Sequence, residues 1–178
     1  MSLKELTREK HAEAENTAFM QAIFKKQLPL HLWVDYTQQR QLFYHGIEGI
    51  AGAAGLLHDL PDIRRAFYLY LDYREMAGDQ FYYHRPEAVD YYNYIISLFG
   101  HKEKILAHLY VWHMGDLFGG QMIKKIVPGS HKSLEFQNPQ LIMTNLRAKL
   151  DDTLAEEAIV AFEWAIKILK SYDNELNI

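Results

Sequence analysis

Residues 110–126 constrain the fold of this chain more than any other stretch, because they are both apolar and rich in glycine. Apolar side chains fall on every face across about five turns, which indicates a helix. Gly115, Gly119 and Gly120 lie inside it and together cost about 3 kcal/mol of helix stability. Taken alone, they favour close packing against another helix over the alternative, a large flat ligand against the backbone. A single carboxylate, Asp116, lies beside them.

Apolar residues recur at helical spacing elsewhere too, and no alternating strand pattern occurs. All five prolines fall at expected helix boundaries. Ser2 and Glu5 have the spacing of a capping box at the start of the first helix. The chain therefore predicts an all-α, single-domain bundle of about seven helices over residues 1–178. The expected helices cover residues 3–26, 32–57, 61–76, 86–99, 101–126, 139–150 and 152–171.

The composition narrows the classes of function. The 178 residues carry a net charge of −4 and no dense basic run, which argues against nucleic acid as a partner. The absence of cysteine excludes disulfides and thiolate metal sites, and it fits a reducing compartment. The charged N-terminus lacks the apolar core of a signal peptide, and no run approaches the roughly 20 apolar residues of a membrane span. We therefore expect a cytoplasmic protein with no membrane partner.

One face of the first helix carries a histidine among charged residues. Lys4, Arg8, His11 and Glu15 follow one another at helical spacing and form a single stripe. An imidazole whose second nitrogen meets a carboxylate is a good iron ligand, and two cations can pair with the carboxylates of a ligand. The alternative is a solvated charged face, and spacing alone favours that alternative.

Two motifs together resemble those of the haem oxygenase family. Residues 11–20, HAEAENTAFM, are similar to the family's proximal-helix motif, and residues 115–126, GDLFGGQMIKKI, to its distal-helix motif. They occur in the family's order, and the resemblance covers nearly the whole chain. It implies a soluble enzyme of the bacterial, plastid or phage type. Haem would lie between a proximal helix and a kinked, glycine-rich distal helix.

The resemblance also implies roles for individual residues on the proximal side. His11 matches the haem iron ligand, and Glu15 matches the acidic residue that hydrogen-bonds it. Lys4, Arg8 and Arg147 match basic residues near the haem propionates.

On the distal side, the resemblance implies three glycines over the haem face, an aspartate that holds a water network, two tyrosines of that network and an aromatic residue of the pocket wall. These are Gly115, Gly119, Gly120, Asp116, Tyr44, Tyr110 and Phe162. Two positions depart from the family pattern. Trp112 stands where many relatives carry an arginine, which puts the outer part of the network in doubt. Met143 stands where a lysine is frequent, which removes one propionate partner.

The activity implied is oxidative cleavage of haem, with O₂ and electrons, to biliverdin (the alpha isomer), Fe²⁺ and CO. Haem would be both substrate and cofactor, with its iron bound by His11. A ferredoxin or a flavoprotein reductase would supply the electrons. An acidic ferredoxin could dock near Lys124, Lys125, Arg147 and Lys149, although ordinary solvated helices show similar basic patches.

Two other classes of function are weighed against this enzyme. A non-catalytic haem carrier or sensor would need His11 and the cations, but neither Asp116 nor the glycines. A ferritin-like di-iron enzyme needs Glu-x-x-His pairs, which the chain lacks. A related bundle family that degrades thiamin commonly uses a cysteine, which is also absent. His45, His108 and His113 are rival ligands, but they lie on apolar helices, where a hydrogen-bonded core histidine is the favoured role.

Overall fold

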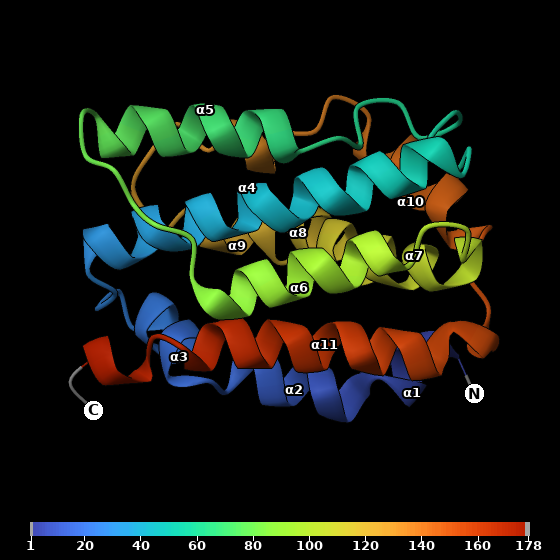
Figure 1. Ribbon diagram of the computed structural model, residues 1–178, viewed down its shortest axis with the longest axis horizontal. Coiled ribbons are helices and arrows are strands. Elements are labelled where there is room, and N and C mark those ends of the chain that lie inside the picture. The colour runs from blue at the N-terminus through green and yellow to red at the C-terminus, as the bar shows by residue number, and fades with distance from the viewer. Residues whose placement is uncertain (1, 177–178) are drawn as a thin grey trace.

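The fold is built around α4 (Leu30–Ala53), the longest of the described helices, which runs through the middle of the molecule (Figure 1). The computed structural model describes residues 2–176, and these contain helices and no β-strand. The predicted all-α class is therefore confirmed. The helices are more numerous than the seven expected, because several predicted helices are divided.

The elements of the described residues follow one another in this order: α1 (Leu3–Leu6), α2 (Arg8–Glu15), α3 (Ala18–Phe24), α4, α5 (Ala66–Ala77), α6 (Pro86–Ser97), α7 (Lys102–Leu109), the π-helical turn η1 (Tyr110–Met114), α8 (Gly115–Phe118), α9 (Gly120–Ile123), the 3₁₀ turn η2 (Lys132–Leu134), α10 (Pro139–Arg147), the 3₁₀ turn η3 (Asp152–Leu154), α11 (Ala155–Lys170) and the 3₁₀ turn η4 (Asp173–Glu175).

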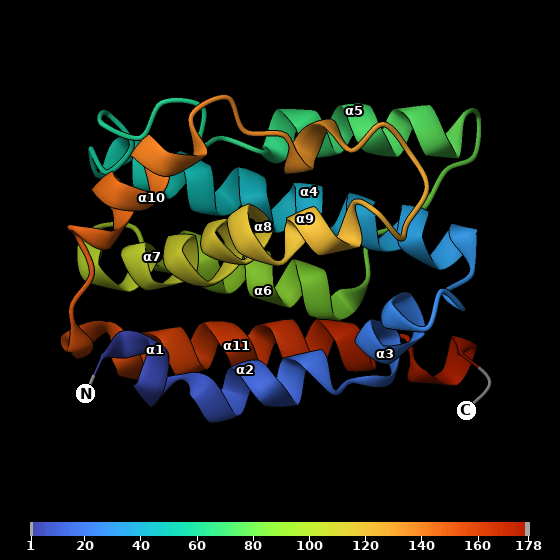
Figure 2. The same cartoon turned by 180° about the vertical axis from the view of Figure 1, so that it is seen from behind.

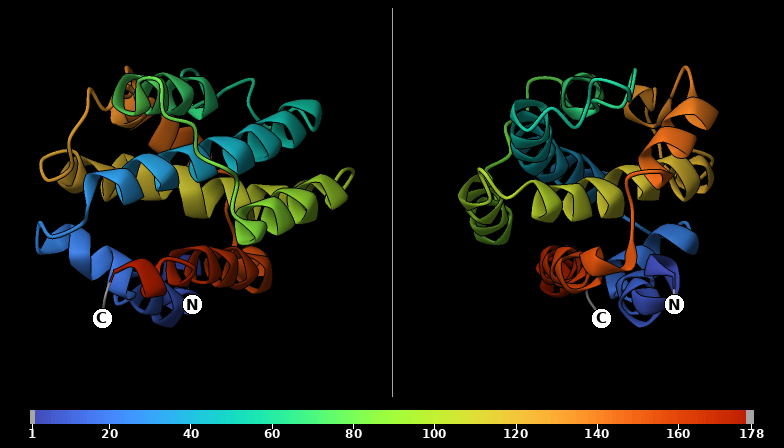
Figure 3. Two further views of the ribbon diagram at one scale, coloured as in Figure 1. Left: turned by 60° about the vertical axis from the view of Figure 1, so that its left-hand side comes forward. Right: turned by 90° about the vertical axis from the view of Figure 1, so that its right-hand side faces the viewer.

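The helices form layers around α4. Helix α4 packs against α5 on one side and against α6 and α7 on the other, while α11 packs against α2, α3, α6 and α7. Seen from behind, α8 and α9 lie above α2 on the same side of the molecule (Figure 2). Figure 3 shows that α11 and the N-terminal helices make a layer of their own beneath the layer of α4, α6 and α7. The apolar core fills the space between these layers, and Phe43, Tyr91 and Leu109 within it are fully buried.

The first predicted helix is divided by two threonines. The Ser2–Glu5 capping box is present as expected. Thr7 then ends α1, and its hydroxyl donates to the carbonyl of Leu3 (2.9 Å). Thr17 caps α3 by accepting from the backbone N–H of Met20 (3.4 Å). Threonine hydroxyls offer the backbone such alternatives to a continuous helix, so α1, α2 and α3 are separate helices that follow one another along α11 (Figure 1).

The third predicted helix begins later than expected. Pro61 does not start it, because residues 61–65 form a turn followed by irregular chain, and Asp62 has a left-handed backbone (φ 62°). Helix α5 begins only at Ala66, whose N–H donates to the buried carboxylate of Glu48. The helix start is therefore set by a carboxylate of α4 and not by the proline.

The glycine-rich stretch is helical, as predicted, but it is not a regular α-helix. Helix α7 passes into η1, a turn of the wider π type, and then into α8 and α9, which are separated at Gly119. We call the whole run from α7 to α9 the distal helix. A π turn accommodates one extra residue and frequently occurs at functional sites. Within residues 2–176, no helix combines the length and the apolarity needed to cross a bilayer.

Candidate functional site

Two adjoining cavities lie between α2 and the distal helix. The outer cavity has a volume of about 750 Å³ and the inner cavity about 200 Å³. The outer volume is typical of a site that buries a sizeable ligand. Both cavities share the same central lining of histidine, carboxylate, glycine and aromatic residues, namely His11, Glu15, Val111, Gly115, Gly119 and Phe162. The two cavities therefore form one site with two compartments.

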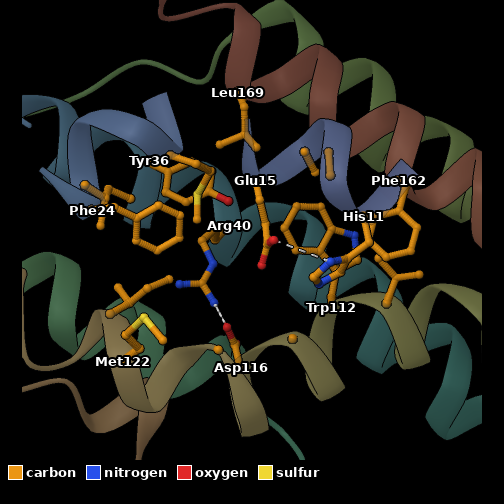
Figure 4. A pocket seen from close by; sticks show the side chains of 18 of the residues that line it. His11, Glu15, Phe24, Tyr36, Arg40, Trp112, Asp116, Met122, Phe162 and Leu169 are labelled. Carbon is orange, nitrogen blue, oxygen red and sulfur yellow. Dashed lines mark hydrogen bonds and ion pairs between the residues drawn. The ribbon is translucent and has the colours of Figure 1, made fainter. Parts of the chain in front are cut away.

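Helix α2 forms the proximal wall and is a solvated face. It contains no buried residue, and the side chain of His11 is 56% exposed. The His11 ring meets the edge of Phe162, with ring centroids 5.6 Å apart. His11 Nδ1 lies 3.8 Å from Glu15 Oε2, which is ion-pair range but too long for a hydrogen bond (Figure 4). Since Glu15 lies beside Nδ1, Nε2 is the nitrogen left to bind a ligand.

Three cations surround the mouth of the outer cavity. Lys4 and Arg8 reach it from the N-terminal helices and Arg147 from the end of α10. The Arg147 guanidinium lies 5.4 Å from the ring centroid of Phe118. Asp151 and Asp152 line the same cavity and offset part of this positive charge. The structure thus brings together the three basic residues that the sequence singled out.

The glycines of the distal helix divide between two faces. A Cβ added to Gly115 would meet no atom within 4 Å, and both Gly115 and Gly119 line the cavities. A ligand can therefore approach this backbone closely. Gly120 was expected on the same face, and this is wrong. It is buried, it lines neither cavity, and its Cβ would lie 2.9 Å from Leu134 Cδ2. Gly120 therefore serves helix packing.

Asp116 is the acidic centre of the distal wall. Its side chain accepts hydrogen bonds from Arg40 Nη2, which lies 2.6 Å from both carboxylate oxygens, and from the Tyr44 hydroxyl, 2.8 Å from Oδ2. The same hydroxyl lies 3.1 Å from the carbonyl oxygen of Trp112 and accepts from Arg40 Nη2 at 3.3 Å. Figure 4 shows Asp116 and Arg40 facing one another beside the inner cavity. The expected pairing of Asp116 with Tyr44 is confirmed.

Burial and charge shift the titration of this network. Burial raises the pKa of Tyr36 to about 12, and the charge of Asp116 adds to this while that of Arg40 opposes it. Burial also raises the pKa of Tyr44, as does Asp116. For Arg40, burial would lower the pKa, but the negative charge of Asp116 outweighs this effect and raises it. Both phenols stay protonated as donors, and Arg40 stays charged.

The sequence predicts Tyr110 in this network and gives no place in it to Arg40. Tyr110 lines the outer cavity, and within residues 2–176 no direct hydrogen bond joins it to Asp116 or Tyr44, so its place in a water network stays a prediction. Arg40 was missed altogether. Its neighbours in the sequence gave no signal for burial, because Arg40 stands in the polar run TQQRQ (residues 37–41).

The rival histidines separate into two roles. His108 is fully buried; its Nδ1 accepts from the Tyr91 hydroxyl (2.7 Å) and its Nε2 donates to Glu157 (3.1 Å). His113 is fully buried too, and its Nε2 donates to Glu48 (3.0 Å). The predicted core role is confirmed for both. His45 is exposed on α4, so a core role for it is wrong. None of these three histidines lines the outer or the inner cavity. Among the described residues that line them, His11 supplies the imidazole.

The fold and the cavities define a class of protein: an all-α protein with a cavity between a histidine-bearing helix and a glycine-lined helix backbone. The sequence model of a family described as "Heme oxygenase" matches residues 1–149. The chain belongs to the haem oxygenase family.

Individual relatives agree with this membership. The chain is 31% identical to "Heme oxygenase 1" of Gallus gallus over 137 residues, which is 70% of this chain and 45% of that protein. It is 26% identical to "Heme oxygenase 2" of Mus musculus over 96% of this chain and 64% of that protein. The chain thus spans about half to two thirds of the length of these relatives. Its fold matches the crystal structure of haem oxygenase-1 from the cyanobacterium Synechocystis sp. PCC6803 in complex with haem, with a TM-score of 0.84, 20% identity and coverage of 98% and 91% of the two chains.

Proposed function

We propose that this protein is a haem oxygenase that cleaves haem to biliverdin, Fe²⁺ and CO. The observation that carries the proposal is the pairing of two unlike walls across one site. The imidazole of His11 stands on one side, and on the other lies helix backbone stripped of side chains at Gly115 and Gly119. Membership of the family supports the same conclusion.

The residues present fit haem. A flat macrocycle needs a slot without side chains on one face, and nothing lies within 4 Å of a Cβ built on Gly115. Its iron needs an axial donor, and His11 offers Nε2 while Glu15 lies on the Nδ1 side. Its two propionates need cations, and Lys4, Arg8 and Arg147 lie at the mouth. When bound, haem supplies both the iron that activates O₂ and the ring that is oxidised.

The chain's own residues bind, orient and supply protons. Phe162 packs edge-on against the His11 ring and limits its rotation. Asp116 accepts hydrogen bonds on the distal side and can orient a water there for proton transfer. Apolar side chains such as Phe24 and Leu169 line the inner cavity and limit its bulk water. Positioning and a proton path are thus the protein's share of the reaction.

The electron donor belongs to the proposal as well. We expect a ferredoxin or a flavoprotein reductase to dock at the basic residues beside the cavity mouth. In the structure, Lys124 pairs with Glu135 (2.6 Å) and Lys149 with Asp59 (2.7 Å), so part of this patch is neutralised. The absence of cysteine fits a reducing, cytoplasmic location.

The test is to add haemin and a reductant in air and follow the visible spectrum. We expect the Soret band to disappear and a broad red biliverdin band to grow, with chromatography of the product giving the isomer. A parallel sample without reductant should keep its Soret band, and catalase excludes bleaching by free peroxide. A stable Soret band in the presence of reductant and O₂ would instead indicate a haem carrier or sensor.

A further inference from the structure

Arg40 is a charged residue in a place where charge is costly. It lies on α4, is 4% exposed and lines the inner cavity, whose other walls include Ile23, Phe24 and Trp33. Taking an ion pair out of water costs several kcal/mol per ion before pairing repays it, so apolar residues would often serve stability as well or better. Stability alone therefore does not account for a buried Arg–Asp pair beside an apolar cavity.

We propose that Arg40 is the positioning residue of the distal wall: it holds Asp116 as a carboxylate and fixes which of its lone pairs faces the cavity. The proposal rests on the proposed function. The proposal also accounts for Trp112, which stands where many relatives carry an arginine. In this chain the positive charge beside Asp116 comes from Arg40 on α4 instead.

The geometry leaves Asp116 with little freedom. A carboxylate has about four acceptor positions. Arg40 Nη2 lies 2.6 Å from both oxygens, and the Tyr44 hydroxyl lies 2.8 Å from Oδ2. These contacts occupy about three of the four positions, which leaves about one for a water of the inner cavity. With its other positions occupied, Asp116 would accept a hydrogen bond from that water and orient it, and the water would be the group that donates a proton onward.

The hydrogen bonds of the Arg40 side chain converge on one nitrogen. All hydrogen bonds of its side chain within residues 2–176 use Nη2, so Nε and Nη1 keep their donors for water. The arginine also borders a small cavity of about 10 Å³ that is lined by Thr37 and Asp72 as well. This space is about that of one water. Asp72 is buried and fixed by the backbone N–H groups of Lys132 and Ser133 (2.9 Å each).

The first experiment needs no haem and no turnover. In protein labelled with ¹³C at the aspartate carboxyl groups, the Asp116 signal is assigned by its loss in Asp116→Asn, and its ionisation is followed by infrared or NMR spectroscopy against pH. We expect an ionised Asp116 at neutral pH in the wild type. In Arg40→Met, a buried carboxyl without its counter-charge should be protonated at neutral pH. An Asp116 that stays ionised in Arg40→Met overturns the proposal.

The second experiment uses the haem-loaded protein. Arg40→Met should shift the pH of the visible transition of the ferric haem spectrum and lower the biliverdin yield about 10- to 100-fold, the usual effect of losing an outer-shell partner. The matched control is Arg85→Met, since Arg85 Nε also pairs with an aspartate (Asp35, 2.7 Å) but lines neither cavity. Equal losses of yield in the two variants would show a general stability effect and overturn the proposal.

A charge-conserving variant covers the case in which Arg40→Met does not fold. Arg40→Lys keeps the positive charge, but its ammonium ends one bond short of the position of Nη2, so Asp116 should stay ionised while the biliverdin yield falls. Unchanged yield in Arg40→Lys would show that only charge matters and would overturn the positioning role. If the wild type makes no biliverdin although the ionisation of Asp116 depends on Arg40, the proposed function fails and the counter-ion assignment stands.

Discussion

The two walls of the cavity are built in opposite ways. The proximal wall, α2, has no buried residue, and its functional pair, His11 and Glu15, lies at 3.8 Å with both side chains about half exposed. The distal wall places Asp116 among buried partners at 2.6 to 2.8 Å. The proximal residues are therefore held by few contacts, whereas the distal residues are held by several buried hydrogen bonds. Substitutions should thus affect function alone on one wall, and both function and folding on the other.

The largest effect should come from the proximal wall. We expect His11→Ala to lower biliverdin formation by more than about 100-fold, beyond the usual loss for an outer-shell partner. Its free energy of unfolding should change by no more than about 0.5 kcal/mol, because the side chain is exposed. Turnover assays and denaturant unfolding measure the two quantities. His45→Ala, an exposed histidine on α4, is the control and should change neither. Full turnover in His11→Ala, with an unaltered ferric spectrum, would mean that another group binds the iron.

Substitutions in the distal wall should lower the free energy of unfolding. Asp116→Ala leaves Arg40 buried without a counter-charge, so the free energy of unfolding should fall by about 3–5 kcal/mol. Removing both charges in Arg40→Leu/Asp116→Leu should restore much of it, as a double-mutant cycle by denaturant unfolding would reveal. Asp35→Ala is the matched control, and its loss should be smaller because its partner Arg85 is more exposed than Arg40. An Asp116→Ala protein as stable as the wild type would contradict the contrast between the walls.

Two glycines of the distal helix, Gly115 and Gly120, should also differ in their effects on stability and function, but by smaller amounts. Gly115→Ala should raise the free energy of unfolding by up to about 1 kcal/mol, because helix propensity improves and the new methyl meets no atom. It should also weaken haem binding. Gly120→Ala should instead lower stability by about 1 kcal/mol, because overpacking against Leu134 outweighs the gain in propensity. Thermal unfolding and haem titration of the two variants test this, and stabilisation by both would place Gly120 in open space.

The smallest effect is a pH-dependent change in stability, and it concerns a chain of hydrogen bonds that begins in the distal helix. There Trp112 Nε1 donates to the Tyr91 hydroxyl, which leads through His108 to Glu157. Burial alone would raise the pKa of Glu157, but hydrogen bonds from His108, Tyr94 and Lys104 lower it from 4.5 to about 2. The unfolded chain therefore binds more protons, and this contribution to stability is lost as the pH falls from 4.5 towards 2.

His108 acts in the same direction at higher pH. Burial lowers the pKa of His108 below 6.5, so its contribution is complete above 6.5 and declines below it. Thermal midpoints of Glu157→Gln and the wild type, measured over the acid range, should show a shallower decline below pH 4.5 in the variant. Parallel declines would mean that the Glu157 contacts do not favour its charged form.

The sequence predicts local features of this site better than distant pairings. The helical class, the Ser2 cap and the stripe that carries His11 follow from spacing within one or two turns. The Asp116–Tyr44 pair followed from the resemblance to a family. Arg40 could not be found in this way, because its contact with Asp116 joins residues 76 apart in the chain. The face of Gly120 was missed for a related reason, since helical spacing does not tell which neighbour a face meets.

The π-helical turn at Tyr110–Met114 affects where the distal helix can gain or lose a residue. In a regular α-helix, an inserted residue rotates everything after it by about 100° around the helix axis and moves it about 1.5 Å along that axis. A π turn instead absorbs one extra residue, so the helix after it keeps its phase. Deleting one residue between Tyr110 and Met114 should therefore let the turn relax to ordinary α geometry while Asp116 still faces Arg40. A further inserted residue should turn Asp116 and Gly115 away from the cavities, so this stretch should tolerate the loss of one residue better than the gain of one.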